Sequence, residues 1–312
     1  MSYQRNDVHV SQPLTKFALK YIQDEKSMIG DMVAPQVESV KEQDLYYTFD
    51  RGNWRLTEDV RAPGDESNRS TVPILSTSTY NIQEHTLHDV VPFRVIDEAD
   101  AALEPKQDTT SDLMEQLMIN KEYAVQAVAF ASANVSDYVT LSGALQWDYT
   151  STVAIIDDVT TGQFTISQNI GKMPNQGVMG TDVWKIVKNN DDILDRIKYS
   201  QKGILTPDLV AACFDLDELQ IGKAVYMSTN PGITSEATAY IWGKTFLLQY
   251  KQPRPRKRGM SHVYQFTKKG GTARVKEWER RENDGVWIEP GLFYVAKPIS
   301  SYCGYAIFEV VG

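Results

Sequence analysis

The residues best suited to metal or acid–base chemistry are four histidines, of which His85 and His88 lie three positions apart and directly precede Asp89. Imidazole and carboxylate groups are ligands that zinc accepts. The remaining histidines, His9 and His262, are distant in sequence, and no cysteine lies near the pair. We therefore expect no metal site in this chain.

A second candidate for chemistry is Gly243-Lys244-Thr245, which has the order found at the end of a phosphate-binding loop. Such a loop needs a further glycine five residues earlier and a helix after it. The chain has Thr238 at that position, and the surrounding pattern is typical of a strand. We expect no phosphate or cofactor site there.

Catalysis by paired carboxylates or by a nucleophile is also not indicated. Asp157-Asp158 and Asp191-Asp192 lie in polar surroundings typical of helix ends or turns, whereas acid–base pairs need environments that separate their pKa values. No serine occupies a Gly-x-Ser-x-Gly motif, and neither Cys213 nor Cys303 lies in a nucleophile signature. We predict no catalytic residues, no cofactor and no enzyme activity.

Composition describes an ordinary globular protein. The 312 residues are 42% hydrophobic and 23% charged, and no apolar run approaches the ~20 residues of a membrane span, so we expect no membrane partner. The polar residues 1–13 do not resemble a secretory signal, and two isolated cysteines suit a reducing compartment. The net charge of -9 disfavours general binding to nucleic acid, so any such contact must be local.

The elements that would position functional side chains begin with an amphipathic helix over residues 13–32, whose apolar face must pack on this subunit or on a neighbouring one. Alternating runs at 45–49 and 76–83 predict a hairpin. The connection between them holds about twenty mostly polar residues, which is too long for simple closure. An inter-subunit strap and a mobile loop both remain open for it.

Further along, caps at residues 109–112 precede a long helix, while the Val-, Ile- and Thr-rich segment 153–170 fits strand or helix equally. Helical spacing returns at 183–197, and a short helix begins at Thr206-Pro207-Asp208. Strand patterns follow at residues 219–228, 239–250, 273–281, 286–296 and 302–311. Helices and strands lack a repeating order, so the predicted fold class is α+β.

Several motifs, in order, resemble the major capsid proteins of tailed bacteriophages, which have the Hong Kong 97 fold. The resemblance covers the chain from about residue 30 to its end. It rests on Asp44 to Trp54 followed by Arg61 to Glu66, on Pro92-Phe93-Arg94-Val95, on Pro174 to Gly180 before Val183-Trp184, on Ile193 to Tyr199, on Gly222 to Tyr226 and on Ile241-Trp242-Gly243. The family also has a helix near 149–166, so the resemblance favours helix there, although Thr152-Val153-Ala154 departs from the family's usual Asp-Pro start.

The resemblance implies an L-shaped subunit with five parts. These are an N-terminal arm at 1–40, an extended hairpin called the E-loop at 41–84, a peripheral domain at 85–170 with its spine helix at 110–133, an axial domain at 171–262, and C-terminal strands at 263–312 that return to the peripheral domain. Such subunits form pentamers and hexamers of an icosahedral shell around double-stranded DNA. We therefore expect a late structural protein, assembled in the host cytoplasm and located in the virion.

The resemblance also implies partners. Besides further copies of itself, we expect a portal protein, a separate scaffolding protein and, as one means of strengthening the shell, a cement or decoration protein. The scaffolding protein is expected to be separate because no fused scaffold precedes the first helix. Some relatives link subunits through an E-loop lysine, but no lysine occurs between Lys41 and Lys106, so we predict a non-covalent shell.

Single residues follow from this interpretation. We expect inter-subunit contacts from the arm and the E-loop at Phe17, Tyr21, Trp54, Arg55, Arg61 and Asp65. The cationic run of Arg254, Arg256, Lys257 and Arg258 has two interpretations, a solvated loop between strands or a weak, non-specific contact with packaged DNA. The alternatives to a phage capsid are an encapsulin-like compartment shell and, more remotely, a soluble enzyme with a lid at 50–75.

Overall fold

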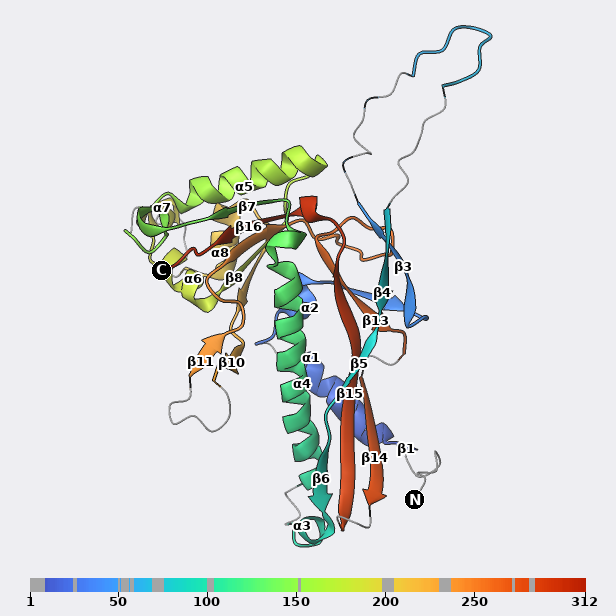
Figure 1. Ribbon diagram of the computed structural model, residues 1–312. Coiled ribbons are helices and arrows are strands. Elements are labelled where there is room, and N and C mark those ends of the chain that lie inside the picture. The colour runs from blue at the N-terminus through green and yellow to red at the C-terminus, as the bar shows by residue number, and fades with distance from the viewer. Residues whose placement is uncertain are drawn as a thin grey trace.

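The computed structural model describes residues 9–24, 27–49, 51, 56, 59–68, 76–99, 104–150, 153–197, 205–229, 237–270, 273–280 and 284–312. Two sheets organise the described chain (Figure 1). The larger has seven strands: β1 (His9–Val10), β14 (Ala273–Arg280), β15 (Gly285–Pro298), β13 (Val263–Lys268) and β2 (Gln36–Ser39), with β5 (Gln83–Thr86) and β6 (Asp89–Pro92) also paired to β15.

The smaller sheet has five strands in the order β7 (Asp137–Thr140), β16 (Gly304–Phe308), β12 (Phe246–Gln249), β8 (Gln176–Gly180) and β9 (Glu218–Gly222). Two hairpins stand outside both sheets. These are β3 (Gln43–Thr48) with β4 (Ser76–Asn81), and β10 (Val225–Met227) with β11 (Thr238–Tyr240).

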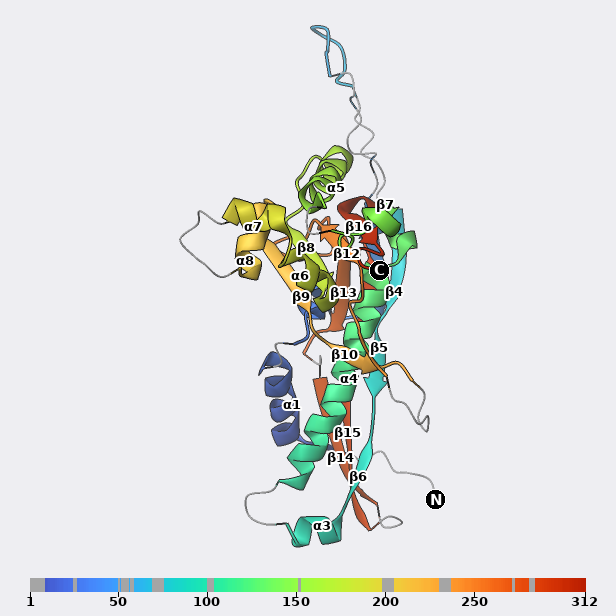
Figure 2. The same cartoon turned by 90° about the vertical axis from the view of Figure 1, so that its left-hand side faces the viewer.

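A long helix, α4 (Pro105–Ala129), runs along the seven-stranded sheet (Figures 1 and 2). Met114 and Leu117 on α4 are buried against Val275 and Ile288 of β14 and β15. The helix begins five residues earlier than the predicted residue 110, because Pro105 at its first turn fixes the backbone dihedral that a helix needs. It ends at 129, and a 3-10 turn, Ser132–Asn134, follows it.

The N-terminal apolar stripe forms two helices, α1 (Gln12–Asp24) and α2 (Gly30–Val33), where we predicted one. Leu14 and Ala18 of α1 are buried in the same cluster as Met114 of α4 and Val275 of β14. Of the two alternatives for the apolar face of this helix, packing on its own chain or on a neighbouring copy, the first holds for Leu14 and Ala18.

Segment 153–170, which the pattern left undecided, contains α5 (Ile155–Ile170). Its buried side chains, among them Ile155, Val159 and Ile166, belong to the core of the five-stranded sheet. The helix ends at Gly171, whose φ of 66° is the left-handed conformation that glycine adopts without strain.

The helical spacing over 183–197 forms two helices, α6 (Thr181–Val187) and α7 (Asp191–Ile197), rather than one. Asn190 separates them. Its Oδ1 accepts a hydrogen bond from the backbone N–H of Ile193 at 3.2 Å, while its Nδ2 donates to the carbonyl of Val153 at 3.0 Å. Asparagine side chains favour this capping arrangement over the helix interior. α8 (Pro207–Cys213) follows, and α3 (Phe93–Asp97) lies beside β6.

Each of the two sheets takes its strands from more than one of the predicted segments. β13, β14 and β15 join the seven-stranded sheet, but β16 pairs with β12 and β7 in the five-stranded one. α5 and β7, which lie within the predicted segment 85–170, also pack with the five-stranded sheet. Pairing between segments distant in sequence sets this division, and local patterns carry no information about it.

Candidate assembly site

The short helix α2 lies where the two sheets and α4 meet, and side chains distant in sequence satisfy both of its ends. At its start, the carboxylate of Glu122 on α4 accepts hydrogen bonds from the backbone N–H groups of Ile29 at 2.8 Å and Gly30 at 2.7 Å. These are among the N–H groups that a helix leaves without an internal partner. The indole Nε1 of Trp242 donates a third hydrogen bond to Glu122 at 2.7 Å.

Burial raises the pKa of Glu122, although the three N–H donors favour the charged form. The neighbouring Asp31 forms an ion pair with Lys121, whose Nζ lies 2.5 Å from Oδ1 of Asp31. Burial opposes ionisation of Asp31 as well, but the Lys121 ammonium, together with hydrogen bonds from Gln36 and Gln265, outweighs burial and holds the pKa of Asp31 below its ordinary value. The two carboxylates are therefore held by different means, one by N–H donors and one by a cation.

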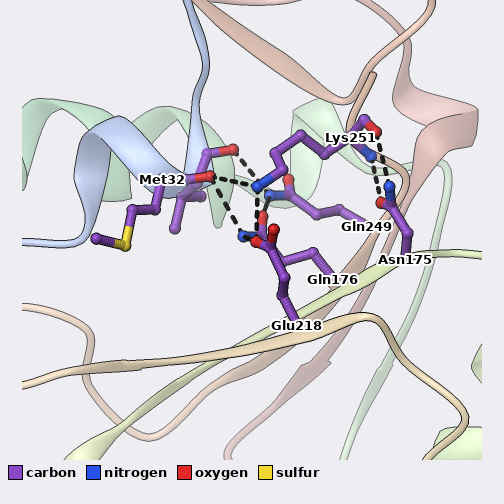
Figure 3. Close-up of polar contacts among 7 residues, drawn as sticks. Met32, Asn175, Gln176, Glu218, Gln249 and Lys251 are labelled. Carbon is purple, nitrogen blue, oxygen red and sulfur yellow. Dashed lines mark hydrogen bonds and ion pairs between the residues drawn. The ribbon is translucent and has the colours of Figure 1, made fainter. Parts of the chain in front are cut away.

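At the other end of α2, glutamine side chains donate to the free carbonyl groups (Figure 3). Gln249 on β12 donates to the carbonyl of Val33 at 2.8 Å, and Gln176 on β8 donates to that of Met32 at 3.2 Å. The Nε2 group of Gln265 on β13 lies 3.2 Å from the carbonyls of both Gly30 and Ala34. All three glutamines are buried.

The same network continues between the strands. Gln249 also donates to Oε1 of Gln176 at 2.6 Å. The ammonium of Lys251 lies 2.7 Å from Glu218 and 3.3 Å from the carbonyl of Met32, and Asn175 pairs with the backbone of Lys251 (Figure 3). Because strands of both sheets hold α2, this turn of helix ties the N-terminal segment, the two sheets and α4 into one unit.

A second junction attaches the β3–β4 hairpin to the body. Tyr80 of β4 stacks on Phe266 of β13 with ring centroids 4.3 Å apart, and its hydroxyl lies 2.5 Å from that of Ser39. At the far end of β3, the N–H of Phe49 donates to the carbonyl of Ile299 at 3.1 Å, and Ser300 donates to the carbonyl of Phe49 at 3.1 Å. The hairpin therefore has a fixed base, and its register pairs Gln43 with Asn81 through to Thr48 with Ser76.

Of the connection between the two strands beyond this base, the structure describes residues 51, 56 and 59–68. In Figure 1, residues 59–68 stand at the top, clear of both sheets. Every described residue from Leu56 to Asn68 is exposed. Leu56 is 102% exposed and Val60 is 77% exposed. Arg61 and Asp65 lie here too, and a turn places the N–H of Asp65 3.2 Å from the carbonyl of Ala62.

The other predicted contact residues are distributed as follows. Phe17 of α1 is half-buried, and Tyr21 lies in the same helix, with its side chain outside the described part of the structure. Trp54 and Arg55 fall outside the described residues. Among the predicted cations, Arg254, Arg256 and Arg258 are exposed and Lys257 is half-buried. Lys257 and Arg258 contact the β3–β4 hairpin.

Of the histidines and cysteines that the sequence offered for chemistry, His85 and His88 pack against aromatic rings and Cys303 lies buried in the core. His85 stacks on Tyr294 at 4.3 Å and His88 on Trp287 at 4.5 Å, ring centroid to centroid. Burial raises the pKa of the Cys303 thiol to about 12. Within the described residues, no group of three or more His, Cys, Asp or Glu side chains is placed to share a metal ion. None of the described helices has the length and apolar character needed to cross a membrane.

Sequence reasoning missed Glu122, Gln176, Gln249 and Gln265. A signal for Glu122 exists, since it lies four residues after Met118 and three before Val125, on the apolar stripe of α4. A charged residue at a core position of a helix requires buried partners. The glutamines carry no comparable local signal, because strands β8, β12 and β13 are buried over most or all of their length.

Comparison with known proteins gives one relative in sequence and several in fold, while no family model matches. The chain is 28% identical over 251 residues to the major capsid protein of Burkholderia phage BcepMu, which covers 77% of this chain and 76% of that protein. Its fold matches a phage-related protein from Bordetella bronchiseptica with a TM-score of 0.76 at 19% identity, over 96% of this chain and 97% of the other.

More distant structures share the fold. A chain of the bacteriophage PhiM1 mature capsid matches with a TM-score of 0.54 at 10% identity, over 88% of this chain and 83% of the other. A prophage capsid protein of Escherichia coli CFT073 matches with a TM-score of 0.55 at 10% identity, over 96% of this chain and 99% of the other. The predicted α+β capsid fold is thereby confirmed. In its sequence and in its fold, the chain resembles the major capsid proteins of tailed bacteriophages, as its motifs predicted.

Proposed function

We propose that this chain is the main shell subunit of a phage head and that the connection between β3 and β4, which is the outer part of the E-loop, joins neighbouring copies. The observation that carries the proposal is the exposure of Leu56 and Val60, together with the position of residues 59–68 clear of both sheets (Figure 1). Placing such apolar side chains in water is unfavourable, and a symmetric assembly removes the penalty by covering them with another copy.

The sequence relative supports the shell, because that protein is a phage major capsid protein, and the fold relatives include a subunit of a mature phage capsid. On this basis we propose pentamers and hexamers in an icosahedral head around double-stranded DNA, formed in the host cytoplasm with separate scaffolding and portal proteins. The predicted division into N-terminal arm, E-loop, peripheral domain and axial domain belongs to the same proposal. Such a subunit carries out no catalysis.

Surface charge is consistent with a container for DNA. The net charge of -9 gives the subunit little overall attraction to phosphate. Contacts with the genome are then weak and non-specific, which permits packaging and release.

Electron microscopy of particles formed with the neighbouring genes tests the shell directly. We expect closed isometric shells that contain DNA in an infected or induced host. Folded monomers alone, under conditions where the neighbouring proteins are present, would contradict the proposal. Shells that lack DNA and enclose a protein cargo would favour a compartment instead.

The role of the E-loop is tested by replacing Leu56 and Val60 together with serine. We expect the unassembled subunit to keep its melting temperature, because neither side chain packs on its own body, while the yield of closed shells falls at least tenfold. Val40→Ser is the matched control, since Val40 is similarly exposed at 79% but lies before the hairpin. Equal shell yields for all three proteins would remove these loop residues from the contact surface.

A further inference from the structure

The cationic run at residues 254–258 is the sequence motif that the proposed function leaves unexplained, and two of its cations contact the base of the E-loop. Nζ of Lys257 lies 3.1 Å from Oδ2 of Asp44 and 5.8 Å from the ring centroid of Tyr80. Asp44 and Tyr80 are direct partners in the β3–β4 register. A single ammonium therefore touches both strands at one position of the hairpin.

Arg258 completes the contact from the other side. Its guanidinium carbon lies 4.8 Å from the ring centroid of Tyr47, within the range of a cation–π interaction. Side chains of a strand alternate between its two faces, so Asp44 and Tyr47, three residues apart, belong to opposite faces of β3. The adjacent cations Lys257 and Arg258 thus reach both faces of the hairpin.

The run itself is anchored, so it is more than a solvated connection. The N–H of Gly259 donates to the carbonyl of Arg256 at 2.8 Å. Gly259 packs so closely on β13 that a Cβ atom there would lie 2.6 Å from the hydroxyl of the buried Tyr264. Two prolines, Pro253 and Pro255, restrict the backbone before it. The cations are therefore presented from a fixed segment.

Charge also favours this arrangement over a free cationic surface. Burial opposes the charge of Lys257, but its interactions with Asp44 and Tyr80 together outweigh burial and raise the pKa of the ammonium. The pKa of Asp44 is lowered by the N–H of Leu45 and by Lys257. Arg254, Arg256 and Arg258 are all exposed and have no ion pair among the described residues, but Arg258 lies over the ring of Tyr47.

We propose that Lys257 and Arg258 form a clamp that fixes the direction in which the E-loop leaves the subunit. The inference rests on the proposed function in that the direction matters for reaching a neighbouring copy. A two-stranded hairpin is only marginally stable alone, so its orientation depends on contacts at its base. The clamp adds cationic contacts on two faces to the Tyr80–Phe266 stacking on one.

The test compares two double variants that each remove two cations, Lys257→Ala with Arg258→Ala, and Arg254→Ala with Arg256→Ala as the matched control. Hydrogen exchange of the unassembled subunit is measured at residues 43–48 and 76–81. We expect exchange in the hairpin to rise about tenfold in the clamp variant and to stay unchanged in the control, because only the first pair touches the hairpin. Closed shells should be replaced by irregular assemblies in the clamp variant alone.

A partner variant keeps the test specific. Asp44→Asn removes the ion pair from the hairpin side and should raise hairpin exchange by itself, while adding Lys257→Ala to it should have less effect than in the wild-type chain. Unchanged hairpin exchange in the clamp variant would overturn the inference, as would equal increases in both double variants. Weaker DNA retention in both double variants, with the hairpin unchanged, would assign the run to packaged DNA instead.

Failure of the clamp can be distinguished from failure of the proposed function. Loss of shell formation in the Leu56 and Val60 variant requires no change in hairpin exchange. If that variant assembles normally but the clamp variant still loses hairpin protection, the clamp stands as a positioning device and the contact role of those loop residues falls.

Discussion

Oε1 of Glu122 accepts a hydrogen bond from Nε1 of Trp242 at 2.7 Å, which joins the middle of α4 to the turn before β12, 120 residues away in sequence. The same carboxylate accepts the N–H groups of Ile29 and Gly30. Three separate segments thus meet at one buried side chain, and no cation contacts it directly. Its removal should loosen all three segments together.

Replacement of Glu122 by glutamine should destabilise the subunit at neutral pH by about 1–3 kcal/mol, because an amide has one acceptor oxygen and would place its NH2 group against a backbone donor. Urea unfolding of the unassembled subunit measures this. Glu115→Gln on the exposed face of the same helix is the control and should change stability little. Similar stabilities for the two variants would show that Glu122 does not connect these segments.

The difference in stability between the wild-type chain and Glu122→Gln should depend on pH, and its direction follows from the pKa of Glu122. Burial raises the pKa of Glu122 above its ordinary value of 4.5, so the folded state holds this proton more tightly than the unfolded state. The resulting stabilisation is fully present below about pH 4.5 and is lost as the pH rises through the folded-state pKa. The wild-type chain should therefore gain stability relative to Glu122→Gln as the pH falls from 7 towards 4.5. A difference that stays constant or shrinks would contradict this.

The glutamine contacts at the other end of α2 make a separate prediction. Replacement of Gln249 by leucine keeps the approximate volume but leaves the carbonyl of Val33 and Oε1 of Gln176 without their donor. Leaving buried acceptors unpaired costs about 1–3 kcal/mol.

Denaturant unfolding measures this loss, and faster hydrogen exchange at residues 30–35 should locate it. Gln83→Leu at an exposed position of β5 is the control. If both leucine variants behave alike, the network around α2 contributes nothing to stability.

Much of this fold could be predicted from the sequence, because local patterns and the order of motifs are informative. The alternating runs at 45–49 and 76–83 form β3 and β4, and the apolar stripe after residue 109 forms most of α4. The resemblance also favoured helix near 149–166, and α5 covers most of that range. These elements have strong periodicity or caps, which depend only on neighbouring residues.

The candidate site could be predicted only in part. Exposure of Arg61 and Asp65 follows from the polar composition of the loop, but the packing of Lys257 against Asp44, 213 residues away, has no local signal. The same holds for Gln265, whose side chain reaches residues more than 230 positions away. Long-range polar contacts of this kind arise when strands of different segments pair, and periodicity does not encode that pairing.

The last prediction concerns how mature particles are held together. An isopeptide link requires a lysine amine, and the E-loop region has none between Lys41 and Lys106. In the proposed shell we therefore expect packing to hold the copies together, with exposed apolar side chains such as Leu56 covered by neighbours and ion pairs at the rim of each contact. When mature particles are boiled in detergent, this subunit should therefore run as one band at 35.2 kDa on a denaturing gel, without bands at multiples of that mass. The same particles treated with an amine cross-linker should give a ladder, which shows that linked oligomers would be seen. A ladder in untreated particles would contradict a non-covalent shell and would place the linking lysine outside the E-loop.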